Sequence, residues 1–361
     1  MDLKNLLVAP TFGYTKGSHI PYKPTFKEVI IEWFDSINFL KDRARLIPFT
    51  FVLFHAVTFV MAIIYFANYF SIISFLFVIA CVLFLATVYN TIWFHRYCSH
   101  AAFSFTNKIF AQLLAWTNPI FFREESYALP HMIHHRYSDK PGDPYGPHLG
   151  WLGSYLGTES QQKFNRNINA AAFELMKKSM SHIPISFNSF DRFIKWGSME
   201  RVSIFLLRMS VAQLFWSIVT CVIGGIPFLF AWYTAVFIFI YLLRDFNWWG
   251  HGGNFRKTKK YGWEFDESST ALNQRFYGYI AGEWHDNHHC FPMSANTGFL
   301  PSQMDLAFKL IQSFHKLGIV NSYFNAIEKF YELHFKPMGE TERQMKINIE
   351  QEESMVSKSV G

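Results

Sequence analysis

Two long stretches of the chain carry no charged side chain. The first, residues 46–95, spans 50 residues without Asp, Glu, Lys or Arg, enough for two membrane helices of about 20 residues each. Its least apolar point is Asn68-Tyr69-Phe70-Ser71, which predicts helices over residues 47–67 and 72–94. The second stretch, residues 209–243, is 35 residues long and contains the breakers Gly224-Gly225-Ile226-Pro227. The pattern predicts an all-α membrane protein with four transmembrane helices in two hairpins.

The remaining segments are expected to lie at the membrane surface or outside it. Residues 109–122 form an apolar run of 14 residues, too short to span and typical of an interfacial or re-entrant segment. Residues 26–40 alternate apolar and charged positions at helical spacing, which indicates either an interfacial helix or a helix packed on a cytoplasmic domain.

The pattern divides the chain into four regions. We expect a cytoplasmic N-terminal segment over residues 1–45, a membrane domain with a cytoplasmic helical cap over 46–300, C-terminal helices over 301–337 and a polar, disordered tail over 338–361. The apolar run at residues 6–9 is too short for the core of a secretory signal, so none is expected.

Charge placement predicts the orientation. Of the 33 Lys and Arg, seven precede the first predicted span, eleven lie in the central loop, two lead into the third span and thirteen follow the fourth, whereas neither hairpin tip carries any. Because loops rich in Lys and Arg stay cytoplasmic, we expect a multi-pass membrane protein with both termini and the central loop in the cytoplasm.

Composition excludes several classes of protein. Half of the residues are hydrophobic and only 17% are charged, against about 25% in soluble domains. The formal charge of +6 is a modest excess, and its basic residues are not interleaved with stacking aromatics, so we expect no nucleic-acid partner. The four cysteines form no CxxC pair, which argues against a disulfide framework or a zinc ribbon.

Histidines carry the candidate chemistry. Nine of the 15 fall into four compact groups, each of which follows an even number of predicted spans, so all nine reach the same side of the membrane. Residues three and four apart share one face of a helix, so each HxxHH group can present its imidazoles together. His95 and His100 are five apart, which predicts that the helix loosens there. The groups are His95 with His100, His131 with His134 and His135, Asn247 with His251, and His285 with His288 and His289.

Nine neutral imidazoles exceed what one metal needs, since a structural zinc closes with four ligands. Two metals with four or five imidazoles each, and Asn247 contributing directly or through a water, fit the count. Imidazole suits iron, zinc, copper and nickel alike, so ligand type does not choose among them. The chain has neither an HExxH pair nor a Glu-x-x-His pair, which argues against a zinc peptidase and a carboxylate-bridged di-iron bundle.

These motifs resemble the integral-membrane fatty acyl desaturases, specifically the stearoyl-CoA desaturase type, whose pattern is HxxxxH, HxxHH, NxxxH and HxxHH. The resemblance covers roughly residues 45–300 and extends to Asp143-Pro144. It implies a di-iron centre that uses O2 and two external electrons to introduce a cis double bond into a long acyl chain. The implied metal ligands are His95, His100, His131, His134, His135, His251, His285, His288 and His289, with Asn247 holding a water.

The resemblance also implies partners. The substrate would be a fatty acyl group on CoA, on acyl carrier protein or on a lipid, and the chain would meet it within membrane lipid. An external electron donor such as cytochrome b5, ferredoxin or rubredoxin is implied, because the chain has no His-Pro-Gly-Gly stretch typical of a fused haem domain. The chain departs from the family pattern at two places. Met132 stands where an Arg is common, and the order Gly282-Glu283-Trp284-His285 is one residue shorter than the usual Gly-Glu-Gly-Trp before the third box. Both departures bear on regioselectivity and head-group recognition more than on metal binding.

Other interpretations stay open at this point. The same di-iron site could serve an acyl-chain hydroxylase or an oxidative decarboxylase, and a non-oxidative membrane zinc protein or lipid receptor is an alternative from a different class.

Finer roles can also be predicted near the motifs. Asp139, Asp143, Glu283 and Asp286 are candidates to accept the second ring N–H of the histidines. Ile79 and Leu83 are predicted to close the far end of an acyl tunnel.

Overall fold

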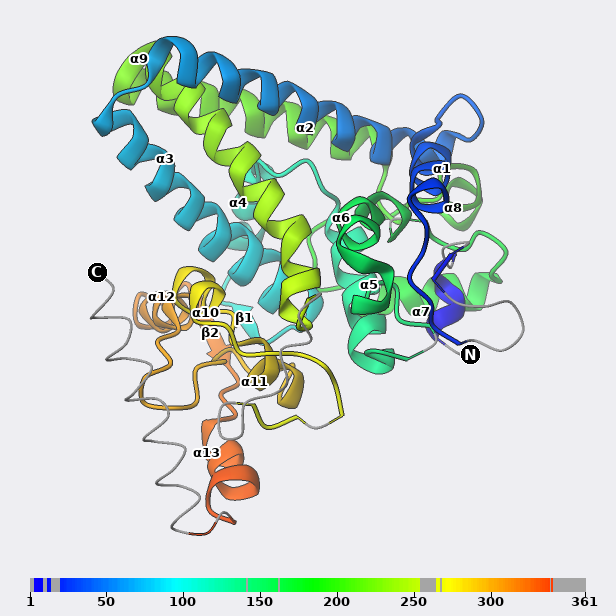
Figure 1. Ribbon diagram of the computed structural model, residues 1–361, viewed down its shortest axis with the longest axis vertical. Coiled ribbons are helices and arrows are strands. Elements are labelled where there is room, and N and C mark those ends of the chain that lie inside the picture. Colours follow the sequence, from blue (N-terminus) through cyan, green and yellow to red (C-terminus); the bar gives the residue numbers. More distant parts are fainter. Residues whose placement is uncertain are drawn as a thin grey trace.

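The computed structural model describes residues 3–8, 12–13, 20–140, 142–161, 163–253, 264–266, 268–337 and 339. The polar tail predicted over residues 338–361 therefore lies outside the described residues, apart from Gly339. The described chain is mostly helical (Figure 1). The long helical segments are α2 (Leu46–Ile64) continued by the π-helix η3 (Tyr65–Tyr69), α3 (Ile72–Phe84) continued by the π-helix η4 (Leu85–Ser99), and α9 (Val202–Gly250).

Shorter elements surround these segments. They are η1 (Leu3–Leu6), α1 (Phe26–Ile37), η2 (Arg43–Arg45), α4 (Lys108–Thr117), α5 (Glu124–Tyr137), η5 (Pro147–Leu149), α6 (Gly150–Gln161), α7 (Ala170–Ser179), α8 (Phe190–Trp196), α10 (Arg275–Ala281), α11 (His285–Cys290), α12 (Leu306–Lys316), α13 (Ile327–Phe330) and η6 (Tyr331–Phe335). Strands β1 (Phe103–Phe105) and β2 (Val320–Tyr323) form an antiparallel pair, with a register shift between Ser104 and Phe105.

Three helical segments of the described chain are long and apolar enough to cross a membrane: Arg43–Tyr69, Ile72–Ser99 and Val202–Gly250. Their outer faces carry large apolar side chains, including Ile72, Leu214 and Val222, which are 76%, 63% and 82% exposed. Such exposure is costly in water and suits contact with lipid tails.

Helix α9 is a helical hairpin rather than a straight rod. The rings of Trp216 and Trp232 stack with centroids 4.6 Å apart, and the Ser217 hydroxyl lies 2.9 Å from the Tyr233 hydroxyl. Sixteen residues of straight α-helix would separate these partners by about 24 Å. The chain reverses at Gly224 and Gly225, where the φ/ψ values are not helical, at the position that the sequence predicted.

The two reversals lie at the same end of the long helices (Figure 1). The connection between η3 and α3 and the reversal within α9 occupy the upper left, whereas α5, α6, α10 and α11 lie toward the opposite ends of these helices. The segments that carry the histidine groups are therefore gathered at one end of the bundle.

Helix α1 has two faces with different surroundings. Thr25 and Glu28 form a capping box at its start, and Val29 packs with Leu149 in a small apolar cluster. Phe26 and Phe34 are 70% and 59% exposed. The helix thus packs on the rest of the chain through one face, and the interfacial location of the other face stays a prediction.

A buried ion cluster anchors the start of α5 and the start of α9. The Arg208 guanidinium lies 2.8 Å from carboxylate oxygens of both Glu124 and Glu200, and it also donates to the carbonyl of Ala115. Arg123 lies 3.3 Å from Glu125 in the same region. Helix α5, which carries the first HxxHH group, is held at its N-terminus by this cluster.

Candidate metal centre

The structure brings the nine predicted histidines into two buried groups. Within each group, one possible ligand atom from each residue lies within 4.8 Å of every other. The first group is His95, His100, His131, His135 and His288, and the second is His134, His251, His285 and His289. This division into five and four matches the expected count for two metals.

The π-helix η4 explains how His95 and His100 share one group. In a π-helix each backbone N–H bonds to the carbonyl five residues earlier, so residues five apart lie one turn apart on one face. The backbone N–H of His100 donates to the carbonyl of His95 at 3.3 Å, which extends this pattern to the end of the element. The predicted loosening of the helix is confirmed.

Each HxxHH helix contributes to both groups. On α5, His131 and His135 are four apart and share a face, whereas His134 is turned about 100° from His135. On α11, His285 and His289 join the second group and His288 joins the first. Two short helices therefore hold the two groups side by side, with the rings of His135 and His289 only 4.6 Å apart.

The Nε2 atoms converge within each group. In the first group the Nε2 of His288 lies 2.9 Å from that of His95 and 2.8 Å from that of His135. In the second group the Nε2 of His251 lies 3.1 Å from those of both His134 and His285. Imidazole nitrogens bind a first-row metal at about 2.0–2.1 Å, so nitrogens about 3 Å apart can reach one ion together.

The unpaired nitrogens also fit a metal. Among the described residues, the buried Nε2 atoms of His100 and His289 have no hydrogen-bond partner. A buried nitrogen without a partner is costly unless something else satisfies it, and an ion at the centre of each group would do so. The all-nitrogen donor set suits iron, zinc, copper or nickel.

Carboxylates and hydroxyls hold the opposite ring nitrogens. Glu283 Oε2 lies 2.9 Å from His95 Nδ1, and Asp143 accepts from His134 Nδ1 at 2.8 Å. Asp139 lies 3.6 Å from His251 Nδ1. These three carboxylates thus face histidines as predicted, and such partners fix the tautomer that leaves Nε2 free to bind.

Other partners differ from the prediction or were missed by it. The Asp286 carboxylate accepts from the backbone N–H groups of Phe265 and Asp266, so it braces a loop. Tyr145 was missed: its hydroxyl lies 2.7 Å from His131 Nδ1. Its place just after Asp143-Pro144 was the only signal in the sequence that could have found it.

Burial favours the neutral form of His134 and His285. It lowers the pKa of His134 to about 4 and that of His285 to about 3, because a charged ring loses its hydration inside the protein. Burial alone would raise the pKa of Glu283, but His95 and His285 outweigh this effect and hold the pKa well below its usual range. At neutral pH His134 and His285 are therefore neutral imidazoles, the form that metals bind.

A cavity opens beside both groups. Its wall includes His95 and His131 from the first group and His285 from the second, together with Asn247, one helical turn before His251 on α9. Most of the remaining lining is apolar, including Phe122, Phe239, Leu242, Leu243, Ile280 and Ala281. An apolar cavity whose wall includes side chains that could bind metal suits part of a hydrocarbon chain.

The prediction for the end of the tunnel is corrected. Ile79 is 44% exposed on α3 and, like Leu83, does not line the cavity. The residues that line the cavity come instead from η4, the continuation of α3. They are Ala86 and Asn90, together with His95. The cavity therefore lies closer to the histidines than the sequence suggested.

Comparison with known proteins agrees with this site. The family described as fatty acid desaturase matches residues 73–299, which include all nine histidines. A hex-5-enoyl acyl-carrier-protein acetylenase of Moorena producens is 24% identical over 65% of this chain and 72% of its own length. An sn-1 stearoyl-lipid 9-desaturase of Synechocystis is 23% identical, covering 63% and 65% of the two chains. An acyl-CoA C20 Δ5-desaturase of Anemone leveillei is 26% identical, covering 64% and 67%. The chain belongs to the fatty acid desaturase family and is an oxidoreductase.

Proposed function

We propose that the chain is an O2-dependent di-iron desaturase that introduces a cis double bond into a long acyl chain. The observation that carries the proposal is the shared wall: one apolar cavity touches His95 and His131 of the first histidine group and His285 of the second. A methylene held in this cavity would lie beside both metals.

The nine histidines are proposed as the ligands of the two irons, with Asn247 holding a water near the second group. Bound iron would supply the redox chemistry by which O2, two electrons from an external donor, two protons from solvent and two hydrogens of the acyl chain become two waters. We propose cytochrome b5, ferredoxin or rubredoxin as that donor.

The protein's own residues orient the histidine rings and shield the reacting methylene from water. Glu283 holds the proton of His95 on Nδ1, which directs the lone pair of Nε2 toward the first group. Phe239, Leu242 and Ile280 line the cavity and exclude water from the reacting methylene. Tyr145 performs the same orienting role for His131 through its contact with Nδ1.

The arrangement of the helices supports a four-span topology. The hairpin of α9 supplies two apolar arms, and α2 and α3 supply two more. With both reversals at one end and the basic loops at the other, we propose that both termini and the metal centre face the cytoplasm. The acyl head group would then sit at the cytoplasmic mouth of the cavity.

The substrate class is a fatty acyl group carried by CoA, acyl carrier protein or a membrane lipid. Relatives named for each of these three carriers match about two thirds of the chain. The apolar lining accounts for the acyl chain, which all three carriers share.

Lipid profiling of a host with and without the chain tests the reaction, with His288→Ala as the inactive control. We expect lipid products that lack two hydrogens. Elemental analysis of the purified protein should find about two iron ions per chain. Products that gain oxygen would indicate a hydroxylase, and loss of the carboxyl carbon would indicate a decarboxylase. Unchanged lipids with zinc as the only metal would overturn the proposal in favour of a zinc protein or lipid receptor.

A further inference from the structure

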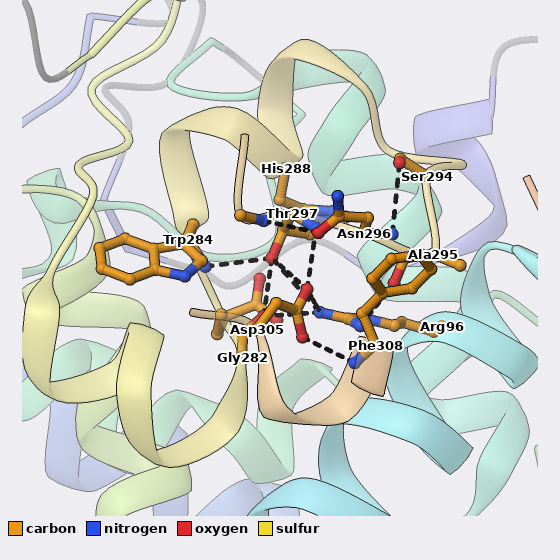
Figure 2. Close-up of polar contacts among 12 residues, drawn as sticks. Arg96, Gly282, Trp284, His288, Ser294, Ala295, Asn296, Thr297, Asp305 and Phe308 are labelled. Atoms are coloured by element: carbon orange, nitrogen blue, oxygen red, sulfur yellow. Dashed lines mark hydrogen bonds and ion pairs between the residues drawn. The ribbon is translucent and has the colours of Figure 1, made fainter. Parts of the chain in front are cut away.

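The residue that follows His95 reaches into the C-terminal part of the chain. Arg96 is 1% exposed, and its guanidinium donates to the carbonyls of Ala295 at 2.5 Å and Gly282 at 2.6 Å. It also pairs with Asp305 at 2.7 Å (Figure 2). One side chain of η4 therefore contacts three positions that are separated from it by about 190 to 210 residues of sequence.

Asp305 links that guanidinium to two further backbone N–H groups. One carboxylate oxygen accepts from Arg96 and from the backbone N–H of Thr297 at 2.9 Å. The other accepts from the backbone N–H of Phe308 at 2.8 Å and so caps the start of α12. The Thr297 hydroxyl donates to the carbonyl of Gly282 at 2.7 Å (Figure 2).

These hydrogen bonds join two sides of the candidate metal centre. On one side Arg96 directly follows His95, and on the other Gly282 directly precedes Glu283. Glu283 and His95 are in contact across this joint, with Oε2 and Nδ1 2.9 Å apart. A shift of the Gly282 carbonyl would therefore move the carboxylate that orients His95.

A buried ion pair is a weak explanation for stability by itself. Burying both charges costs hydration, and well-packed apolar residues would stabilise the fold equally well or better. What the pair supplies is one defined geometry, because both terminal nitrogens of the Arg96 guanidinium have acceptors and only Nε lacks a partner. Asp305 lies beyond the segment that matches the family, so a C-terminal residue contacts the neighbour of His95.

We propose that Arg96 and Asp305 are positioning residues of the metal centre, which fix His95 relative to Glu283 and α11. This inference rests on the proposed function, since it assumes that the histidine groups bind metal. The inference gives Asp305, which follows the segment that matches the family, a part in metal binding without making it a ligand.

The test is Co2+ binding to metal-free protein in detergent, followed by the visible absorption of the bound ion. Asp305→Asn keeps the size of the side chain but leaves Arg96 facing an amide. We expect Co2+ to bind up to about 10-fold more weakly, with an altered absorption spectrum, because losing a direct partner of a ligand histidine costs about 10- to 100-fold and Asp305 acts only through Arg96, Gly282 and Glu283. Measurement well below the unfolding temperature separates this effect from a loss of folded protein.

Asp42→Asn is the matched control. Asp42 also caps a helical turn, accepting from Ala44 N–H at 3.0 Å, and also pairs with an arginine, Arg166. It contributes to neither histidine group, so Asp42→Asn should bind Co2+ as the unmodified chain does.

A second variant keeps the inference testable if Asp305→Asn does not fold. Thr297→Val is nearly isosteric and removes the hydroxyl that donates to Gly282 and accepts from Arg96 and the Trp284 N–H. The ion pair between Arg96 and Asp305 is kept, so a smaller loss of Co2+ affinity is expected. Folded variants that bind Co2+ with unchanged affinity and spectrum would overturn the inference. Failure of the unmodified chain to bind Co2+ would instead overturn the proposed metal centre.

Discussion

His134 and His135 are consecutive residues of α5, yet they belong to different histidine groups. Their side chains leave the helix about 100° apart, so one faces His251 and the other faces His288. The helix thus forms part of the wall between the two groups.

This relationship predicts the effect of removing either ring. His134→Ala and His135→Ala should each lower product formation by at least about 100-fold, because each removes a ligand from one of two metals that act together. Each variant should retain about one metal per chain, measured by elemental analysis of purified protein. If both variants keep the full metal complement and activity, the assignment of these rings as ligands is wrong.

Ala86 is predicted to limit the length of the acyl chain. It lines the cavity and is 7% exposed, so Ala86→Leu should fill space that the chain occupies and shift products toward shorter chains. The measurement is the chain-length profile of the products by mass spectrometry. Ile79→Trp on the same segment is the control, because Ile79 is outside the cavity and the enlarged side chain should leave the profile unchanged.

The reversal of α9 depends on a glycine. Gly225 has φ 68° and ψ −158°, a backbone conformation that residues with a Cβ atom rarely adopt. Gly225→Ala should therefore lower the free energy of unfolding by about 1–3 kcal/mol. Val222→Ala, at an 82% exposed position of the same helix, should change it far less. Denaturant titration in detergent compares the two, and equal effects would contradict this account of the turn.

The buried ion cluster predicts a pH dependence of stability. Arg123 and Arg208 face Glu124, Glu125 and Glu200, so the five groups carry one negative charge in excess. Burial raises the pKa of Glu200 to about 8, with Arg208 opposing this and the two other carboxylates adding to it. A proton on Glu200 neutralises the cluster.

The sign of the effect follows from linkage. Because the folded pKa is above the ordinary value of 4.5, the stabilising contribution is fully present below pH 4.5 and is lost as the pH rises through about 8. The loss is at most about 1.4 kcal/mol per pH unit over that range. Glu200→Gln, which mimics the protonated group, should flatten the pH profile of thermal stability, and an unchanged slope would assign the titration elsewhere.

The features that the sequence predicted well are local in the chain. The apolar stretches, the reversal at Gly224-Gly225 and the HxxHH spacing each depend on residues within a few positions of one another. The family follows from the same motifs and is confirmed by the match over residues 73–299.

Features that depend on contacts between residues far apart in the chain could not be predicted from the sequence. The contact of Arg96 with Asp305 joins positions 209 residues apart, and no spacing rule links them. Tyr145 reaches His131 because the loop after α5 folds back on it. The end of the cavity was misplaced because it depends on how α3, α5 and α9 pack, which single-helix periodicity does not describe.

The π-helical turn at the end of η4 gives the spacing of the first histidine pair a meaning of its own. Two histidines four apart would line up on an ordinary α-helix, as they do on α5 and α11. The extra residue between His95 and His100 is tolerated because the backbone there is wound one residue wider per turn. The four residues between the two rings therefore match the wider π-helical turn. Deleting one of them would place the two histidines on one face only if the backbone there became an ordinary α-helix.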